Sequence, residues 1–385
     1  MIAKVGTQKV NFKRVVKQIK TIIMNVINQI KKPLKGLSRS NSENGKISTA
    51  QSGLTVELPR DMYAHTPQSI FNEKGCPTEW WWHIGTLNAS GGRAFGFEIN
   101  AAALYPGGFT EVMLTDLKNQ IHYHQTQTED LILSEWAETD VTKPWFVKLK
   151  NVSMIAPQAD PTQNMCVIAE IEDKGKKISF DLTFSQEGVP LMVWGDGVEP
   201  NIPDPQLYNC NFYFSLTRLK ASGTIVITDI ADSTNTETHE VTGTTWMDHE
   251  WGKFGSKQKP VKWILQDIQL DNGVCLSNFS TTKPVLNTAT SGKATVQLQK
   301  DGASYFVDSR MTPTKSKKIG KVTYFTEVLV EIPEYGISAV VKSLMPDQVF
   351  EGNIYEGVGS ASGTMMDGEN KVVVSGTAWV EQSIK

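Results

Sequence analysis

Short runs in which polar and apolar residues alternate fill the chain from residue 54 onward, and this pattern constrains the fold most strongly. Each run has the length and the period-two alternation of a β-strand, and Gly, Pro, Asn or Asp separates it from the next. Clear examples are AFGFEINAA (94–102), KISFDLTFS (177–185), FYFSLTRL (212–219), GTIVITDI (223–230) and ATVQLQ (294–299). Helical periodicity over a long stretch is missing here, so the sequence predicts an all-β body made of barrels or sandwiches.

A faint internal repeat divides this body in two. Trp80 to Leu87 (WWWHIGTL, then NASGG) is similar to Trp263 to Leu270 (WILQDIQL, then DNG), and GTTWMD at 243–248 is similar to GTAWVE at 376–381. We therefore expect two copies of one β-module, at 54–255 and 256–385, with a boundary near Gly255. If each module closes, its first and last strands must pair, because closure removes free edges. The strand at 79–87 should then lie beside the strand at 243–252.

Residues 1–53 differ in character from this β body. Apolar residues recur at helical spacing from Phe12 to Ile30, most of the lysines and arginines lie off that stripe, and Pro33 ends the pattern. A basic amphipathic helix of this kind is typical of an interfacial anchor, so residues 10–35 are predicted to bind an anionic membrane surface. A helix docked on the protein's own body and a targeting segment are the alternatives. Lysines interrupt the apolar residues, which does not fit a secretory signal, so the predicted location is the cytoplasm, with peripheral membrane attachment as an option.

Charge is distributed unevenly along the chain. Residues 1–42 contain ten Lys or Arg and no acid, which leaves 28 basic against 41 acidic residues in the remainder, a formal charge of −13. A body this acidic is not expected to bind nucleic acid through a broad basic face.

The cysteines and histidines do not predict a metal site. Cys76, Cys166, Cys210 and Cys275 are scattered without a CxxC pair, which fits reduced, buried thiols better than a zinc site or a disulfide framework, although one or two bridges stay open. The six histidines contain no HxxxH pair. We therefore expect neither a metal nor a cofactor.

Two strand-like stretches combine ionisable residues with indole rings. They are Glu79-Trp80-Trp81-Trp82-His83 and TGTTWMDHEWG at 242–252. Because side chains alternate along a strand, each stretch has two faces. In the first, Glu79, Trp81 and His83 lie opposite Trp80 and Trp82; in the second, Trp246, Asp248 and Glu250 lie opposite Met247, His249 and Trp251. A strand that lines a hydrophobic ligand cavity would need such a mixture.

A carboxyl group beside indole rings suits proton transfer. Poor solvation raises its pKa, so it can stay protonated near neutrality and act as a general acid. The ring face of Trp can also stabilise a cationic intermediate. We predict that Asp248 is the acid and that His249 and Glu250 hold it, with Trp81, Trp246 and Trp251 as cavity walls.

Other interpretations stay open at this point. Asp248, His249 and Glu250 could form a hydrogen-bonded plug at a barrel end, and the Trp-rich strand could be core packing. The protein could also be a lipocalin-like carrier that holds a hydrophobic small molecule without chemistry. A Ser-His-Asp hydrolase is not favoured, because a GxSxG elbow and strand–helix alternation are both missing.

Several motifs together resemble the AttH/CrtC family. They are Glu79-Trp80-Trp81, WMDHEWG at 246–252, the strand at 263–270 followed by Asp-Asn-Gly, and Tyr355-Glu356-Gly357 with the later GTAWVE. This lipocalin-like group contains carotenoid 1,2-hydratases, fungal kievitone-type hydratases, proteins labelled "predicted secreted hydrolase" and, more distantly, natural-product Diels–Alderases. The resemblance covers roughly residues 54–385, and the N-terminal basic helix is not part of it.

The resemblance implies two lipocalin- or calycin-type β-domains with a hydrophobic ligand in or between them. In the carotenoid hydratases, a His-x-Trp pair and a Tyr-x-Asp pair are implicated in adding water to a terminal double bond. His249-Glu250-Trp251 matches the first pair, whereas Leu265-Gln266-Asp267 offers the Asp but has Leu in place of the Tyr. That departure puts carotenoid hydration in doubt. It leaves hydration, isomerisation or cyclisation of a terpenoid- or polyketide-like substrate, and a pericyclase that folds a linear polyene, as the implied activities.

Candidate site residues fall into two groups. The predicted catalytic residues are Glu79, Asp248, His249, Glu250 and Asp267. The predicted substrate-binding residues are Trp80, Trp81, Trp82, His83, Trp246, Trp251, Trp263, Tyr355 and Glu356.

Overall fold

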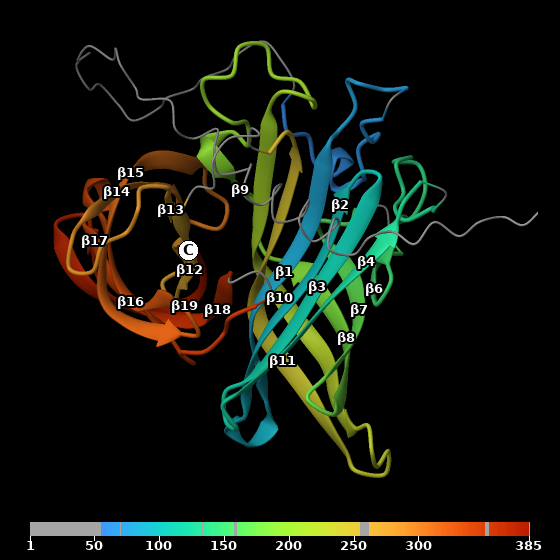
Figure 1. Ribbon diagram of the computed structural model, residues 1–385. Helices are drawn as coiled ribbons and strands as arrows, with labels where there is room; N and C mark the ends of the chain where they lie inside the picture. Colours follow the sequence, from blue (N-terminus) through green and yellow to red (C-terminus); the bar gives the residue numbers. More distant parts are fainter. Residues whose placement is uncertain are drawn as a thin grey trace, which may run out of the picture.

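The structure, a computed structural model, describes residues 55–69, 71–132, 134–157, 160–254, 262–350 and 354–384. Most of it consists of antiparallel strands in two sheets that lie side by side (Figure 1). The predicted all-β class with two barrel-like sheets is confirmed. The predicted basic helix within residues 10–35 and the predicted boundary at Gly255 lie outside the described residues. Among the described residues, none of the helices has the length and apolar character needed to cross a membrane.

The first sheet pairs the two unusual strands directly. Its strands are β1 (Thr78–Ala89), β2 (Ala94–Leu104), β3 (Gly107–Asp116), β4 (Ile121–Asp130), β5 (Trp145–Leu149), β6 (Val152–Ala156), β7 (Asn164–Asp173), β8 (Lys176–Gln186), β9 (Leu191–Met192), β10 (Asn211–Asp229) and β11 (Thr236–Gly252). They follow the order β4-β3-β2-β1-β11-β10-β8-β7-β6-β5, and β9 pairs with β10. Glu79 lies opposite Trp251 and Trp81 opposite His249, so the predicted pairing of 79–87 with 243–252 is confirmed.

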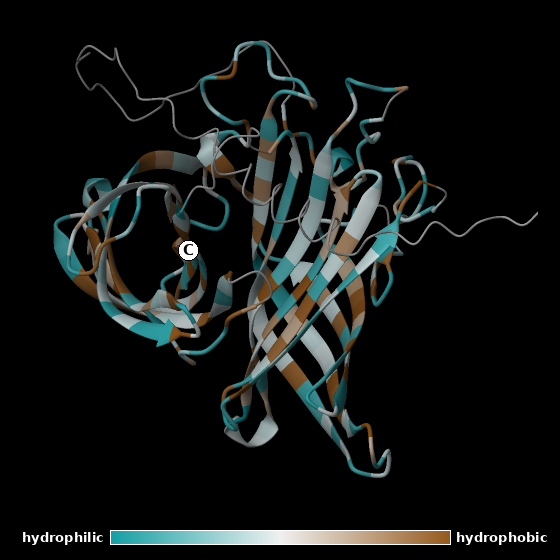
Figure 2. Cartoon of the chain, viewed as in Figure 1, coloured by the Kyte–Doolittle hydropathy of each residue, from teal (hydrophilic) through white to brown (hydrophobic). Residues whose placement is uncertain are grey.

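This first sheet curls until strands from its two halves approach each other. The backbone N–H of His124 in β4 donates to Asp173 Oδ2 at the end of β7 (3.1 Å), and Lys174 Nζ donates to the carbonyl of His122 (2.6 Å). Apolar residues recur along the strands (Figure 2), and their side chains fill the inside of the curl. The fully buried rings there are Trp81, Trp145, Trp251, Phe95, Phe97, Phe180, Phe184, Phe212 and Phe214. The four cysteines are free thiols.

The second sheet is a closed barrel of eight strands. They are β12 (Trp263–Leu270), β13 (Cys275–Ser280), β14 (Thr290–Gln297), β15 (Ser304–Ile319), β16 (Val322–Ile332), β17 (Ile337–Ser343), β18 (Tyr355–Asp367) and β19 (Asn370–Ser383). β12 pairs with β19, so the first and last strands of this module also lie together. Short 3-10 helices complete the described elements: η2 (Arg60–Met62), η3 (Ser90–Gly92), η4 (Val193–Gly195) and η5 (Pro333–Tyr335).

One face of the first sheet packs against the barrel through an apolar cluster separate from both cores. Its members are Ile84, Met113, Leu191, Val193, Tyr213, Trp246, Cys275, Phe350, Ile354, Val358 and Trp379. Hydrogen bonds add to this contact, because Gln269 Nε2 of β12 donates to the carbonyls of Thr217 (2.5 Å) and Thr245 (3.0 Å) in the first sheet. The two modules are therefore joined by a buried, continuous contact.

Gly96 allows a close approach between β2 and β18. A Cβ at position 96 would lie 2.5 Å from Val358 Cγ1 and 2.8 Å from Val358 Cβ. Val358 is β-branched and sits in a closed barrel, so neither the side chain nor the strand can shift at low cost. We expect Gly96→Ala to lower the free energy of unfolding by about 1–3 kcal/mol, the usual cost of overpacking.

Gly107→Ala is the matched control, because a Cβ at that position meets nothing closer than 3.7 Å. Urea unfolding of the two variants measures the difference. Equal stability of the Gly96 and Gly107 variants would contradict the close approach.

Candidate active site between the two sheets

The paired strands β1 and β11 form a wall with one face toward each module. The face inside the curled sheet carries Glu79, Trp81, His83, Met247, His249 and Trp251. The face toward the barrel carries Trp82, Ile84, Trp246, Asp248 and Glu250. Period-two alternation in each strand is confirmed, and the antiparallel register aligns like faces of the two strands.

Seven carboxyl groups meet where the wall faces the barrel. We call this set the acidic layer; it consists of Glu98 of β2, Glu111 of β3, Asp248 and Glu250 of β11, Asp267 of β12, Glu356 of β18 and Glu381 of β19. Six are buried and Glu250 is half-buried. Apart from Glu111, none of these acids forms an ion pair with a Lys, Arg or His among the described residues. Buried acids without a cation nearby hold their protons more tightly than exposed ones.

The hydrogen bonds and the pKa shift of Asp248 are both known in detail. Its Oδ1 accepts hydrogen bonds from Ser215 Oγ (2.6 Å) and Trp246 Nε1 (2.7 Å), whereas its Oδ2 has no hydrogen-bond partner. Burial raises the pKa of Asp248 to about 6, against the opposing effect of these hydrogen bonds and of the nearby Tyr213 hydroxyl. Burial, and then the charge of Asp248, raise the pKa of Asp267 well above its ordinary value. The two aspartates therefore do not ionise independently.

Three glutamates of the layer, Glu98, Glu356 and Glu381, are held in their neutral form by the same cause. Burial raises the pKa of Glu98 and of Glu381 to about 8, and that of Glu356 well above its ordinary value. Trp263 Nε1 donates to Glu381 Oε1 (3.0 Å). Carboxylate oxygens of Glu98, Glu111 and Glu356 lie within 4.8 Å of one another, so they cannot all be charged at low cost. The layer thus contains proton donors that persist at neutral pH.

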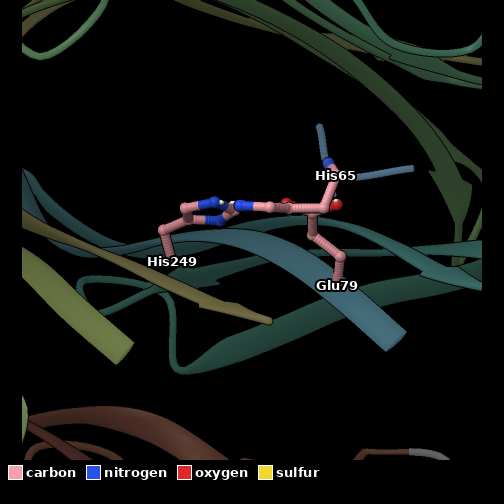
Figure 3. Close-up of side chains that lie close together, drawn as sticks. All are labelled: His65, Glu79 and His249. Atoms are coloured by element: carbon pink, nitrogen blue, oxygen red, sulfur yellow. Dashed lines mark hydrogen bonds and ion pairs between the residues drawn. The ribbon is translucent and has the colours of Figure 1, made fainter. Parts of the chain in front are cut away.

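A second polar cluster lies on the other side of the wall, inside the curled sheet (Figure 3). Glu79 Oε1 lies 2.8 Å from His65 Nδ1 and 3.4 Å from His249 Nε2. Rings stack through this cluster in the order His65, Trp251, His249, Trp81, with successive centroids 4.6 to 4.9 Å apart. Unlike the acidic layer, this cluster brings a carboxylate together with imidazoles.

Opposite charges decide the protonation of this second cluster. Burial alone would raise the pKa of Glu79, but His65 and His249 bring that pKa below its ordinary value. Burial likewise opposes protonation of His65, yet Glu79 and Asp61 raise the pKa of His65 to about 9. His65 and Glu79 therefore form a buried ion pair. His83, on the same face, has a pKa lowered to about 3 by burial, and its ring stacks on Phe184.

The structure divides the predicted site residues between these places. Those at the acidic layer are Asp248, Glu250, Asp267, Glu356, Trp82, Trp246 and Trp263. Those inside the curled sheet are Glu79, Trp81, His83, His249 and Trp251. Trp80 belongs to neither place and stacks on Phe254, with the ring centroids 3.9 Å apart. Tyr355 lies in the barrel core, where its hydroxyl donates to the carbonyl of Met345.

Two expectations about contacts are corrected. His249 does not hold Asp248; Ser215 and Trp246 do, because adjacent residues of a strand point to opposite faces. Glu250 accepts its hydrogen bond from Asn211 Nδ2 and makes none with Asp248. His249 and Asp267, the two residues suggested by the hydratase pairs, lie on opposite sides of the wall rather than together.

The expected open cavity with indole walls is also corrected. Trp81 and Trp251 are fully buried and packed against imidazole rings, so no space adjoins them. The hollow beside His65 and Glu79 has a volume of about 10 Å³, enough for one water molecule. A larger ligand could reach the acidic layer only if side chains at the contact between the modules moved.

Sequence reasoning missed three acids of the layer and one histidine. Glu98 interrupts an otherwise apolar strand, and Glu381 occupies the position of Asp248 in the repeated GTxWxx motif. The sequence therefore contains a pattern that could have identified both residues. No comparable sequence pattern identifies Glu111 or His65, because their partners are distant in sequence.

Comparisons with known proteins agree with this architecture. A profile of the AttH-like family matches residues 49–383. A solved structure assigned as AttH from Nitrosomonas europaea is similar, with a TM-score of 0.65 and 18% identity over 86% of this chain and 97% of that one. Kievitone hydratase from Nectria haematococca is similar with a TM-score of 0.63 and 16% identity, over 88% of this chain and 96% of that one. No curated protein matches the sequence significantly. At these identities the solved structures show a shared fold.

Proposed function

The chain belongs to the AttH-like family, and from this membership and the acidic layer we propose that it is an enzyme that transfers a proton to an apolar substrate. One observation carries the proposal. Asp248 is fully buried between the modules, its pKa is raised to about 6, and its Oδ2 has no protein partner. A carboxyl group in that state is suited to general acid chemistry near neutral pH.

The surroundings of Asp248 support a hydrophobic substrate. Its side chain adjoins Trp246 and the apolar cluster that includes Met113, Val358 and Trp379, so the complementary ligand is hydrophobic. A terpenoid- or polyketide-like molecule with an isolated double bond meets this requirement. The chemistry needs no redox cofactor, because only protons and water are exchanged.

Hydration is the reaction we place first, since a hydratase shares this fold. In that reaction the Asp248 carboxyl group gives its proton to one alkene carbon, and water forms a bond to the other. The surplus proton of that water passes back to the Asp248 carboxylate. The acid is thereby restored. Isomerisation or cyclisation would use the same first step, with loss of a proton from carbon in place of the addition of water.

Isotope incorporation tests the proposal even while the substrate is unidentified. Purified protein is incubated with an apolar extract of its host in D₂O, and in a second sample in water enriched in ¹⁸O, and products are compared by mass spectrometry. Proton transfer to carbon adds deuterium at a C–H position, and hydration also adds ¹⁸O. A pericyclase would convert a compound at constant mass and without isotope, and a carrier would return its ligand unchanged. Either of the last two results would contradict the proposal.

A further inference from the structure

We propose that His65, Glu79 and His249 form a binding site for one divalent transition-metal ion, with Zn²⁺ as the ion that fits these donors best. The site is separate from the acidic layer and lies on the opposite side of the β1–β11 wall. Two imidazoles and one carboxylate are a common ligand set for zinc in proteins.

The donor atoms already have the spacing that an ion requires. One ligand atom from each residue lies within 4.8 Å of the other two. Glu79 Oε1 is 2.8 Å from His65 Nδ1 and 3.4 Å from His249 Nε2 (Figure 3). Ligands about 2.0–2.1 Å from a tetrahedral ion are themselves separated by roughly 3.3 Å. Only small side-chain shifts would therefore be needed to bind the ion.

His249 directs its Nε2 to this point. A backbone carbonyl can only accept, so the contact between His249 Nδ1 and the carbonyl of Trp80 (2.8 Å) places the proton on Nδ1. The ring then directs Nε2 toward Glu79 Oε1, 3.4 Å away, and this nitrogen forms no hydrogen bond although the residue is fully buried. A cation between two electron-rich atoms would satisfy both of them.

The outward nitrogens have the partners that orient metal-binding imidazoles. His249 Nδ1 donates to a carbonyl, and His65 Nε2 lies 3.5 Å from Asp61 Oδ1. Asp61 is fixed in turn by the backbone N–H of Glu57 (2.7 Å) and by Arg60 Nε (2.7 Å). Carbonyl and carboxylate groups in these positions set the ring orientation and strengthen the metal bond.

The site also has room for a fourth ligand and a route to solvent. The hollow of about 10 Å³ is lined by His65, Cys76, Thr78 and Glu79 among others, and it can hold one water molecule. The side chain of His65 is 15% exposed, whereas that of His249 is fully buried. An ion would enter past His65 and would tie the segment that contains His65 to β1 and β11.

Calorimetric titration of the full-length, chelator-treated protein with Zn²⁺ tests this site, and Co²⁺ spectra report its geometry. We expect one ion per chain. His65→Gln should weaken binding by at least about tenfold, and Asp61→Asn, which removes no ligand, by about 10–100-fold. The control His239→Gln changes an imidazole outside the site and should bind as the wild type does.

Graded loss in the Asp61 variant separates a bound metal from a general failure to fold, which circular dichroism checks independently. Saturable binding of one ion that His65→Gln weakens, and His239→Gln does not, supports the site. The proposal is overturned if the wild type shows no saturable binding, or if His65→Gln and wild type bind Zn²⁺ equally well.

Discussion

Replacing Asp248 with asparagine is expected to lower turnover by a factor of about 10²–10⁴, the usual contribution of a general acid, while the fold survives. The amide oxygen can still accept hydrogen bonds from Ser215 and Trp246, as Oδ1 of the aspartate does. The amide nitrogen would take the place of Oδ2, which accepts no hydrogen bond of good geometry. What disappears is the acidic proton, so the chemical step should fail.

The rate of deuterium incorporation in D₂O measures this loss, and thermal unfolding checks that the variant is folded. Asp301→Asn is the matched control, because it makes the same chemical change at an exposed position. Full activity in the Asp248 variant would remove that residue from the mechanism and leave Asp267 as the next acid to examine.

The free energy of unfolding is expected to fall by several kcal/mol as pH rises from about 4.5 to about 8. Glu98 and Glu381 both have an ordinary pKa of 4.5, and burial raises the pKa of each to about 8 in the folded protein. Below pH 4.5 both the folded and the unfolded chain hold these protons. Between the two values only the folded chain does, so the free energy of unfolding falls as pH rises. Above pH 8 the loss is complete.

Denaturant titrations across this pH range measure the slope. Glu98→Gln combined with Glu381→Gln should make the slope shallower, because an amide keeps the shape of the carboxyl group but does not titrate; Asp248, Asp267 and Glu356 still contribute the remainder. Glu369→Gln, at an exposed turn, should leave the slope as in the wild type. If the double variant were as pH-dependent as the wild type, these two glutamates would not be the cause.

Much of the fold could be predicted from patterns of neighbouring residues in the sequence. Period-two alternation predicted the strands and the correct grouping of residues such as Asp248 with Trp246 and of His249 with Trp251. The repeat predicted that β1 and β11 pair, since a module that closes must join its ends. Both deductions use only geometry that every strand shares.

The candidate site was predicted less completely, because alternation says which residues share a face but not what that face meets. Asp248 and His249 were expected to work together, yet one faces the barrel and the other the curled core. Glu98 and Glu381 join Asp248 through strand order and through the contact between modules. His65 reaches Glu79 from an irregular segment that carries no periodic signal.

The sequence by itself determined the all-β class, the strand faces and the presence of acids among indoles, because these depend on side chains within a few residues of one another. Only the tertiary structure decided that the acids form one buried layer between two modules, and that a histidine pair encloses Glu79 on the other side. Those arrangements depend on which distant strands pair and pack. Burial, which raises the carboxyl pKa values, exists only once that packing is complete.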